Sequence, residues 1–414
     1  MPGPLGQLRV LELTTAVAGP IAGIILADMG AEVIKIAQPS PAGRGGAGTV
    51  PALEGAPDHP WNRIPYQNEL HRGKQHLALD LASEEGRALY LRLVESADVV
   101  VENFSPRVMA NLRIDYDDLK AVKPDIVMIS MPAFGKTGPY ALRGSYGPGI
   151  DAMSGLSHLS GYPDRGPGKP ANFYCDQNAG MIAALSAVAA IRHRNRSGEG
   201  QYIELSMLEG ELQVLAPAIM DASINGREQM RIGNRHAWNA PHGIFRCEGD
   251  DDWVALAVES DAQWQALCTV LDRPDLASDA RFATTEGRKA NEDEIDPQIE
   301  AWTAQRDHHE AQQLLQAAGV PTGAVLDIAE VHADRQLAHR GSFDYQDHPE
   351  VGPFPHTRTA WRSRRGNHGV SGHGSIYGGA TDHVLKELLG MSDEEAEAVV
   401  ASGVVAREPL SPPA

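Results

Sequence analysis

The first forty residues alternate between short apolar runs and one helical stretch, and this alternation constrains the fold more than any other feature of the chain. Residues 8–13 (LRVLEL) form one apolar run, IAGIILADMG forms a helical stretch that ends at Gly30, and residues 31–36 (AEVIKI) form a second run. Two buried strands separated by a helix of this length are typical of a βαβ unit in a parallel sheet. The opening of the chain therefore predicts an α/β domain.

The alternation continues through the first half of the chain. An amphipathic helix is predicted over residues 84–96, a strand over 97–101, a short helix over 116–122 and a strand over 125–131. A longer helix over residues 177–194 ends in Arg and His side chains, as helix C-termini often do. The pattern indicates the α/β class, with a Rossmann-like large domain built on a parallel sheet.

The length of 414 residues is too great for one ordinary core, so two domains are expected. Residues 1–222 make up the predicted α/β domain. Residues 223–330 contain a predicted hairpin at 243–258 followed by helices, which indicates a smaller α+β domain. Residues 331–414 are rich in turn signals, with predicted helices over 380–389 and 393–402.

Charge and cysteine content exclude several kinds of partner. The 36 Lys and Arg against 55 Asp and Glu give a net charge of −19, whereas nucleic acid requires a basic face. No apolar run approaches the ~20 residues of a membrane span, and no signal peptide is visible. Cys175, Cys247 and Cys268 form no CxxC pair, which fits a reducing compartment. We therefore expect a cytoplasmic protein without nucleic-acid or membrane partners.

Motifs of other enzyme classes are missing or out of context. The 16 histidines include no HExxH or HxH, so no metal site is predicted, and no serine has GxSxG spacing. The GxGxxG match, GRGGAG at residues 43–48, lies in a Gly- and Pro-rich loop predicted over residues 38–59, and no helix follows it directly. This context disfavours a nicotinamide enzyme, and no tightly bound cofactor is predicted.

Asp176, in the segment PANFYCDQNAGM, comes directly before the long predicted helix. One interpretation is a helix N-cap, because Asp is a favoured capping residue. The other is a nucleophile, because a helix dipole keeps a carboxylate ionised and thus able to attack a thioester carbonyl. The segment alone leaves both open.

Basic side chains gather near the ends of the predicted strands. Ordinary surface charge would explain any one of them, but as a group in a strongly acidic protein they indicate a polyphosphate site. The residues are Lys35, Arg72, Lys74, Arg107 and Lys136.

Seven segments, in this order, resemble the family III CoA-transferases, the CaiB/BaiF group that includes formyl-CoA transferase. The resemblance covers roughly residues 6–406, including the tail GATDHVLKELLGMSDEEAEAVVASGVV. The segments are VLELTTAVAGPIAGIILADMGAEVIKI, HRGKQHLALDL, ADVVVENFSPRVM, MPAFGKTGPY, MSGLSHLSGYPD, FYCDQNAGM and GEGQYIELSMLEGEL.

The resemblance implies a nucleophile at Asp176 and acyl-CoA as substrate. It also implies an interlocked homodimer in which residues 331–414 return to the large domain, although some relatives pair with a sister subunit. Backbone N–H groups of residues 177–179 are candidates to stabilise the oxyanion. The implied CoA site, together with the basic side chains above, consists of Thr15, Ala16, Val17, Lys35, Arg72, Lys74, Asn103, Phe104, Arg107 and Lys136.

The chain departs from the family pattern at several positions. Ala37, His71 and Arg107 replace a usual Glu, Asn and Gly. Racemases of the family use a His where this chain has Tyr146, and a phenol with a pKa near ~10 is a poor base at neutral pH. We therefore expect a CoA-transferase rather than a racemase or a non-catalytic acyl-CoA-binding protein. Tyr146 is either an orienting residue of the site or a buried structural tyrosine.

The segment Gly233–Gly243 (GNRHAWNAPHG) is the predicted determinant of acyl specificity. It lacks the glycine run of formyl-CoA transferase, which favours a larger or aromatic acid. Arg235, His236 and His242 are candidates to pair with a substrate carboxylate, and Trp238 to restrict space. The alternative is a structural linker in which Trp238 belongs to the core.

Overall fold

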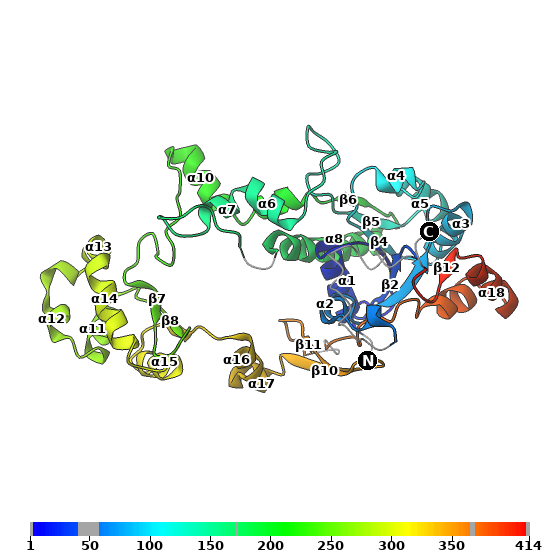
Figure 1. Ribbon diagram of the computed structural model, residues 1–414. Coiled ribbons are helices and arrows are strands. Elements are labelled where there is room, and N and C mark those ends of the chain that lie inside the picture. The colour runs from blue at the N-terminus through cyan, green and yellow to red at the C-terminus, as the bar shows by residue number, and fades with distance from the viewer. Residues whose placement is uncertain (1–2, 40–57, 171–172, 365–368, 411–414) are drawn as a thin grey trace. The chain divides into compact units, whose positions relative to one another are not determined.

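The computed structural model describes residues 3–39, 58–170, 173–364 and 369–410 (Figure 1). It forms two compact units, one of Met1–Leu156, Pro170–Ile224 and Gln336–Ala414, the other of Ser157–Lys169 and Asn225–Arg335. The second unit thus includes residues 157–169, which lie outside the sequence-based boundaries of 223–330. Most of the predicted Gly- and Pro-rich loop, including GRGGAG, lies outside the described residues.

A seven-stranded sheet forms the centre of the first unit, in the order β12-β3-β2-β1-β4-β5-β6. The strands are parallel except β12, which pairs antiparallel with β3. The direction of winding reverses between β1 and β4, the point where ligands bind in open α/β sheets. The strands are β1 (Arg9–Leu13), β2 (Glu32–Ala37), β3 (Gln75–Leu79), β4 (Val99–Glu102), β5 (Val127–Ser130), β6 (Tyr202–Glu204) and β12 (Val405–Ala406).

Helices cover both faces of this sheet, which is why its strands are almost continuously apolar. Leu11 and Leu13 point to the core under α3 (Glu84–Val94), α5 (Tyr116–Val122) and α18 (Asp393–Ala401). Val10 points to the opposite core, under α1 (Ala18–Asp28) and α8 (Tyr174–Ser197), which lie side by side in Figure 1. The predicted α/β fold with a parallel-dominated sheet is confirmed.

The remaining elements of the first unit are short. They include a C-terminal hairpin, β10 (Phe343–His348) with β11 (Gly352–Thr357), that the sequence did not predict. Among the helices of the described chain, none is long and apolar enough to cross a membrane. The short helices are η2 (Pro60–Asn62), α2 (Pro65–Leu70), α4 (Val108–Asn111), α6 (Gly147–Ser154), α9 (Met207–Leu212), α10 (Ala216–Asn225) and η4 (His383–Leu388), and α7 (Leu156–Leu159) lies mostly in the second unit.

The second unit pairs an antiparallel sheet with helices around a core centred on Trp264. The predicted hairpin is present as β7 (His242–Arg246) and β8 (Trp253–Ala257), and β9 (Thr322–Ala324) extends it. The helices are α11 (Asp261–Val270), α12 (Pro274–Ser278), η3 (Ala280–Phe282), α13 (Thr285–Ala290), α14 (Glu292–Thr303), α15 (His308–Ala317) and α16 (Ile328–Ala333), and α17 (Arg335–Arg340) leads back to the first unit.

Candidate active site

The turns that follow β1 and β4 meet at the point where the sheet reverses direction. The Thr15 N–H donates to Oδ1 of Asn103 at 2.7 Å, and Nδ2 of Asn103 donates to the Thr15 carbonyl at 2.8 Å. Ala16 takes a positive φ of 56°, which turns the chain into α1. The first turn of α1 thus lies at the carboxyl end of β1, beside the turn that holds Asn103 and Phe104.

Asp176 lies in the first turn of α8 and points at the start of α1. The backbone N–H of Ala18, the first residue of α1, faces its carboxylate and lowers the pKa of Asp176, although burial outweighs this effect. A Cβ on Gly180 would come within 2.7 Å of the Ala18 carbonyl oxygen, so glycine at this position lets the two helices approach closely. The Asp176 residue is 6% exposed.

The local structure corrects two expectations about Asp176. The helix begins at Tyr174 with Phe173 as N-cap, so the N-cap interpretation of Asp176 is wrong. The Gln177 N–H, one of the candidates for an oxyanion site, donates within the helix to the Phe173 carbonyl at 3.3 Å. Burial, with a smaller contribution from the charge of Asp151, raises the pKa of Asp176 rather than lowering it.

Two tyrosines lie near this carboxyl. Tyr146 precedes α6 and is 74% exposed, so its interpretation as a buried structural residue is wrong. The next residue is Gly147, where a Cβ would lie 2.0 Å from Oδ2 of Asp176, so only glycine fits against the carboxyl. Tyr66 on α2, which the sequence did not single out, has a pKa raised by burial and by the charge of Asp176.

Buried acids accompany Asp176, and the sequence did not single them out. Asp151 on α6 and Glu211 on α9 are both fully buried, and the Cys175 N–H donates to Oδ1 of Asp151 at 3.3 Å. Burial, with the charges of Asp176 and the other acids, raises the pKa of the Cys175 thiol. Cys175 therefore stays protonated at neutral pH and is a poor nucleophile.

Two of the predicted CoA-binding cations are internal. The Nζ atoms of Lys35 and Lys74 lie 3.4 and 2.7 Å from the Glu12 carboxylate, and both side chains are almost wholly buried. Lys35 also donates to the Thr14 carbonyl, and Lys74 to the Pro20 carbonyl at 2.8 Å. Burial lowers the pKa of Lys74 to about 8 against the raising effect of Glu12, and it lowers that of Lys35 as well.

The other predicted cations differ in how strongly they are paired. Arg72 is buried between Asp28 at 2.8 Å and Glu69 at 2.6 Å. Lys136 lies 3.7 Å from Glu102 and stacks over an aromatic ring, with its side chain 22% exposed. Arg107 is exposed at the start of α4. Lys136 and Arg107 are therefore the members of the set that solvent can reach.

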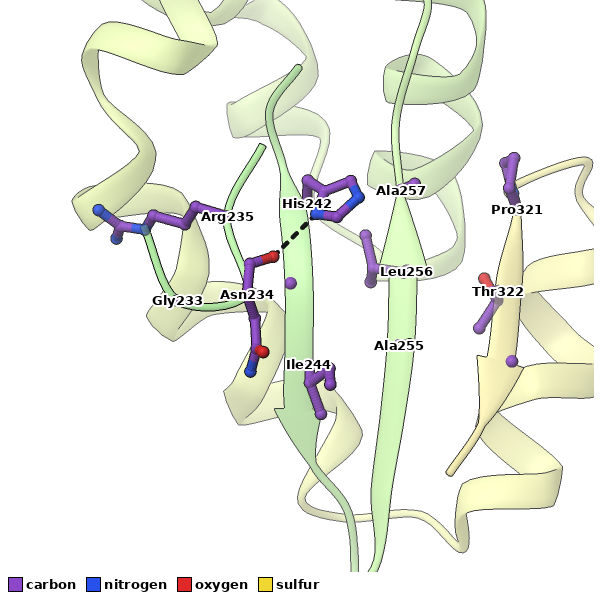
Figure 2. A pocket seen from close by; sticks show the side chains of 12 residues that line it. Gly233, Asn234, Arg235, His242, Ile244, Ala255, Leu256, Ala257, Pro321 and Thr322 are labelled. Carbon is purple, nitrogen blue, oxygen red and sulfur yellow. Dashed lines mark hydrogen bonds between the residues drawn. The ribbon is translucent and has the colours of Figure 1, made fainter. Parts of the chain in front are cut away.

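The predicted specificity segment lines a pocket of about 440 Å³ within the second unit (Figure 2). His242 projects beside Leu256 in this pocket, and its Nδ1 lies 2.8 Å from the Asn234 carbonyl oxygen. Trp238 is 74% exposed, so the alternative that places it in the core is wrong. Arg235 is already bound by carboxylates of α14: Glu292 at 3.2 Å, Asp293 at 2.5 Å and Asp296 at 2.9 Å. Desolvation lowers the pKa of Arg235, but these carboxylates outweigh it, so the pKa is raised.

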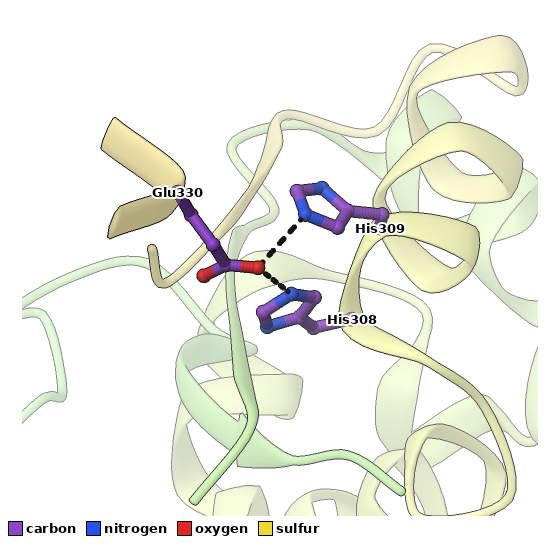
Figure 3. Close-up of side chains that lie close together, drawn as sticks. All are labelled: His308, His309 and Glu330. Atoms are coloured by element: carbon purple, nitrogen blue, oxygen red, sulfur yellow. Dashed lines mark hydrogen bonds and ion pairs between the residues drawn. The ribbon is translucent and has the colours of Figure 1, made fainter. Parts of the chain in front are cut away.

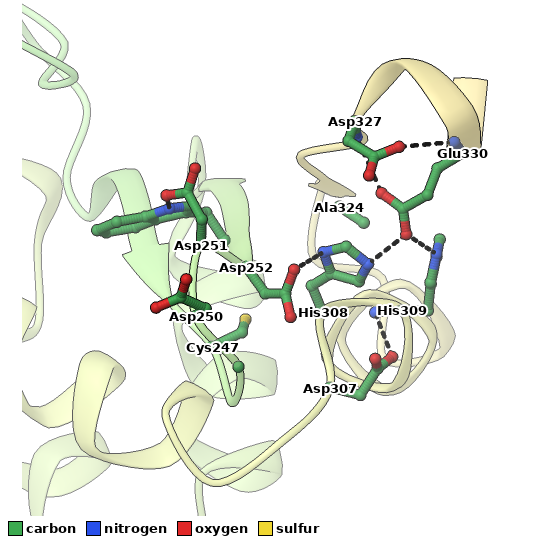
Figure 4. Close-up of polar contacts among 12 residues, drawn as sticks. Cys247, Asp250, Asp251, Asp252, Asp307, His308, His309, Ala324, Asp327 and Glu330 are labelled. Carbon is green, nitrogen blue, oxygen red and sulfur yellow. Dashed lines mark hydrogen bonds and ion pairs between the residues drawn. The ribbon is translucent and has the colours of Figure 1, made fainter. Parts of the chain in front are cut away.

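A second polar cluster of this unit joins α15 to α16. Nε2 of His308 and Nε2 of His309 lie 2.9 and 3.1 Å from the same oxygen of Glu330 (Figure 3). The other oxygen of Glu330 accepts the Asp327 N–H, and His308 faces Asp252 at 3.8 Å (Figure 4). Three such side chains could hold a metal ion, but here they satisfy one another, and we assign them a structural role.

Comparisons with known proteins agree with this architecture. The model of CoA-transferase family III matches residues 5–373. A succinyl-CoA–D-citramalate CoA-transferase of Chloroflexus aurantiacus is 32% identical over 98% of each chain. A succinate–glutarate CoA-transferase of Agrobacterium fabrum is 36% identical over 82% of this chain and 84% of its own.

A solved structure of a relative is also similar to this chain in its three-dimensional fold. A CaiB/BaiF family protein from Brucella suis superimposes with a TM-score of 0.83 at 33% identity, over 94% of this chain and 100% of its own. Sequence and fold therefore agree over nearly the whole length. The chain belongs to CoA-transferase family III, the CaiB/BaiF family.

Proposed function

We propose that this enzyme moves CoA from an acyl-CoA donor to a free carboxylic acid, with Asp176 as the nucleophile. One observation carries the proposal: the buried Asp176 carboxyl faces the Ala18 N–H at the carboxyl end of β1, where the sheet reverses direction. A buried carboxylate in that position, faced by Gly147, is poised for attack on a carbonyl carbon.

The proposed reaction passes through two kinds of covalent intermediate. An Asp176 oxygen attacks the donor thioester carbonyl, which expels CoA thiolate and leaves a mixed anhydride. The thiolate then attacks the aspartyl carbonyl, which releases the donor acid and leaves an aspartyl-CoA thioester. The acceptor carboxylate attacks that thioester, and the thiolate expelled attacks the acceptor acyl carbon. New acyl-CoA leaves, and the Asp176 carboxylate is restored.

The Ala18 N–H gives this reaction sequence a source of electrostatic stabilisation. It faces the Asp176 carboxylate in the free enzyme, and we propose that it binds the oxygen that becomes anionic when the aspartyl carbonyl becomes tetrahedral. The N–H belongs to the first turn of α1, where the helix dipole favours negative charge. The start of α1 thus takes the role that the sequence suggested for residues 177–179.

The proposed CoA site follows the edge of the sheet. Thr15, Ala16 and Val17 after β1, with Asn103 and Phe104 after β4, form its centre. Lys136 and Arg107 are the cations able to meet phosphate directly. Lys35, Arg72 and Lys74 support the site from inside, since their charges are bound to acids within the protein. CoA thioester is a substrate here and not a resident cofactor.

The acid substrates are proposed to be dicarboxylates, on the names of the relatives. D-citramalate, succinate and glutarate, which those names contain, each carry two carboxyl groups. A second carboxylate on the acid requires a cation or N–H donors beyond the reacting centre. Of the side chains that the sequence suggested for this role, Arg235 is held by acids of α14, and Nδ1 of His242 lies against the Asn234 carbonyl oxygen.

Self-association into an interlocked homodimer is also part of the proposal. The first unit exposes a set of apolar side chains on or next to α6, α8, α9 and α10, and exposed apolar groups of this number indicate a binding surface. Measuring the molar mass in solution tests this, and a requirement for a sister subunit would replace it. The side chains are Met153, Met181, Leu185, Val214, Ile219, Met220 and Ile224.

One experiment tests the reaction and the nucleophile together. Acyl-CoA donors, including succinyl-CoA, are incubated with panels of mono- and dicarboxylic acids, and new CoA esters are read by mass spectrometry. Asp176→Ala should abolish transfer while the molar mass stays unchanged, and wild-type enzyme incubated with donor alone should gain the mass of CoA less one water on the peptide that contains Asp176. Exchange of an α-hydrogen with deuterium, without an acceptor acid, would instead identify a racemase.

A further inference from the structure

Two acids lie buried together beside the first turn of α8 without a cation. Asp151 on α6 and Glu211 on α9 are each 0% exposed, and a carboxylate oxygen of one lies within 4.8 Å of a carboxylate oxygen of the other. In the described part of the chain, no ion pair joins either acid to Lys, Arg or His. The titratable groups that face them from the neighbouring helix are Cys175 and Asp176 of α8.

The oxygens of these acids lack donors. One oxygen of Asp151 accepts the Cys175 N–H at 3.3 Å. Among the described residues, its Oδ2 and both oxygens of Glu211 have no donor in good hydrogen-bond geometry, although the Ser154 hydroxyl is near enough to lower the pKa of Glu211. Two ionised carboxylates in that arrangement would repel each other in a medium of low dielectric constant. A single proton held between them removes one charge and turns two orphaned acceptors into a hydrogen bond.

The pair is coupled to the nucleophile in two ways. The hydrogen bond from Cys175 fixes the backbone of the residue before Asp176, and the Cys175 Sγ lies 3.5 Å from Oδ2 of Asp176. The charge of Asp151 also contributes to the raised pKa of Asp176, after burial. A change in the charge or position of the pair therefore reaches the reacting carboxyl.

We propose that Asp151 and Glu211 share one proton and act as positioning residues for Asp176. This inference rests on the proposed function, since it gives the pair a role in the transfer reaction. The hydrogen-bonded pair holds the first turn of α8, and its proton keeps a further negative charge away from the anionic tetrahedral states that form on Asp176. Loss of the proton adds that charge and raises the barrier to transfer.

Burial, followed by the hydrogen bond and charge of Asp151, raises the pKa of Glu211 to about 7. The turnover number of wild-type enzyme should therefore fall by roughly 10-fold or more between about pH 6 and about pH 8.5. The sign follows from the proton: the active form carries it and predominates at the lower pH.

Two isosteric amides test the shared proton. Glu211→Gln supplies a permanent N–H to Asp151, and Asp151→Asn supplies one to Glu211, so neither variant has a proton to lose in this range. In both, the ratio of the turnover numbers at about pH 8.5 and pH 6 should come close to 1. Glu209→Gln, an exposed position on the same helix, is the matched control and should keep the wild-type ratio.

A purely structural role would lower the turnover of both amide variants by the same factor at every pH, and retention of the alkaline decrease would overturn the proposal. An effect of EDTA on the wild-type profile would also overturn it, because a bound cation would then replace the proton.

Stability gives a second readout that needs no activity. Glu211 has a folded pKa of about 7 against an ordinary value of 4.5, so the folded state binds the extra proton between these values. As pH rises through this window, the unfolding free energy of the wild type should fall relative to that of Glu211→Gln. Above the window, the difference between the two unfolding free energies should stay constant. If transfer activity were absent but this difference were found, the proposed function would fail while the shared proton stood. If the difference in unfolding free energy between wild type and Glu211→Gln did not change with pH, the shared proton itself would be refuted.

Discussion

Two groups of buried acids in the first unit differ in whether cations pair with them. Glu12, on β1, lies with its carboxylate between the ammonium groups of Lys35 and Lys74 and accepts the Thr14 hydroxyl at 2.6 Å. Asp176 faces the Ala18 N–H, but among the described residues no Lys, Arg or His pairs with its acidic neighbours Asp151 and Glu211. The first arrangement neutralises charge within the fold, whereas the second leaves Asp176 and Glu211 with raised pKa values.

This comparison distinguishes acids whose charge stabilises the fold from acids whose charge takes part in the proposed reaction. A carboxylate that is fully paired inside the protein cannot bind a substrate cation or attack a carbonyl without breaking those pairs. Acids whose pKa values are displaced by burial and by one another are typical of functional sites. The two sites therefore predict opposite outcomes for similar substitutions, stability being lost at one and activity at the other.

The largest effect is expected when Glu12 loses its charge. Glu12→Gln leaves two buried ammonium groups near a neutral amide, and breaking a buried pair in this way costs about 3–5 kcal/mol. Urea unfolding near neutral pH measures the loss. Glu211→Gln is the matched control, a buried acid without a cation, and it should lose far less stability. A cost under about 1 kcal/mol would mean that the lysines simply release their protons.

The next effect is on activity, at the glycine that faces Asp176. A Cβ at residue 147 would lie 2.0 Å from Oδ2 of Asp176, so Gly147→Ala must displace the carboxyl. A displacement of about 1 Å at a reacting group costs on the order of 100-fold in rate, so transfer should fall by that factor. Gly144→Ala, where a Cβ meets no atom within 4 Å, is the control and should leave the turnover number unchanged. Full activity in Gly147→Ala would place the chemistry elsewhere.

The corresponding glycine at the paired site should affect stability instead. A Cβ at residue 23 would lie 1.8 Å from Oε2 of Glu12 and 2.8 Å from Nζ of Lys74. In a free helix, replacing Gly by Ala stabilises by about 1 kcal/mol. In α1 we expect Gly23→Ala to destabilise by roughly 1–3 kcal/mol, the usual cost of overpacking. Thermal unfolding measures the sign, and a stabilised variant would show that the Glu12 cluster can move aside.

The sequence predicted the sheet and the place of the nucleophile because both leave local signals. Apolar runs mark buried strands, and the segments after β1 and β4 meet because parallel strands end at the same edge. Strand β3 was missed although HLAL is apolar, since it follows a basic turn and the short helix before that turn, α2, was not predicted either. The hairpin of β10 and β11 was missed because its strands contain prolines and charges, which weaken the alternation.

The sequence did not show which buried charged side chains pair with one another. Lys35 and Lys74 were predicted to bind phosphate because basic side chains gather near the predicted strand ends, and only the fold shows that both turn inward to Glu12. One signal was present: Glu12 stands in the middle of an apolar strand, where an acid requires a buried partner. Asp151 and Glu211 gave a weaker signal, since each lies in a short helix with no clear apolar face.

The smallest effect is expected at the contacts of His383 with Glu32 and Glu387, because these side chains are partly exposed to solvent. His383 contacts Glu32 at 2.6 Å and Glu387 at 2.8 Å, with its side chain 28% exposed. Desolvation lowers its pKa, but the hydrogen bonds to the two glutamates outweigh it, so the pKa of His383 is raised. The pair's contribution is therefore complete below the ordinary His pKa of ~6.5 and is lost as pH rises through the higher folded value. Because solvent screens such pairs, the loss should stay below about 1 kcal/mol, and His383→Gln should flatten the wild-type dependence of unfolding free energy across that range. A loss of several kcal/mol would mean that this pair behaves like the buried Glu12 cluster, and that exposure does not separate the two kinds of site.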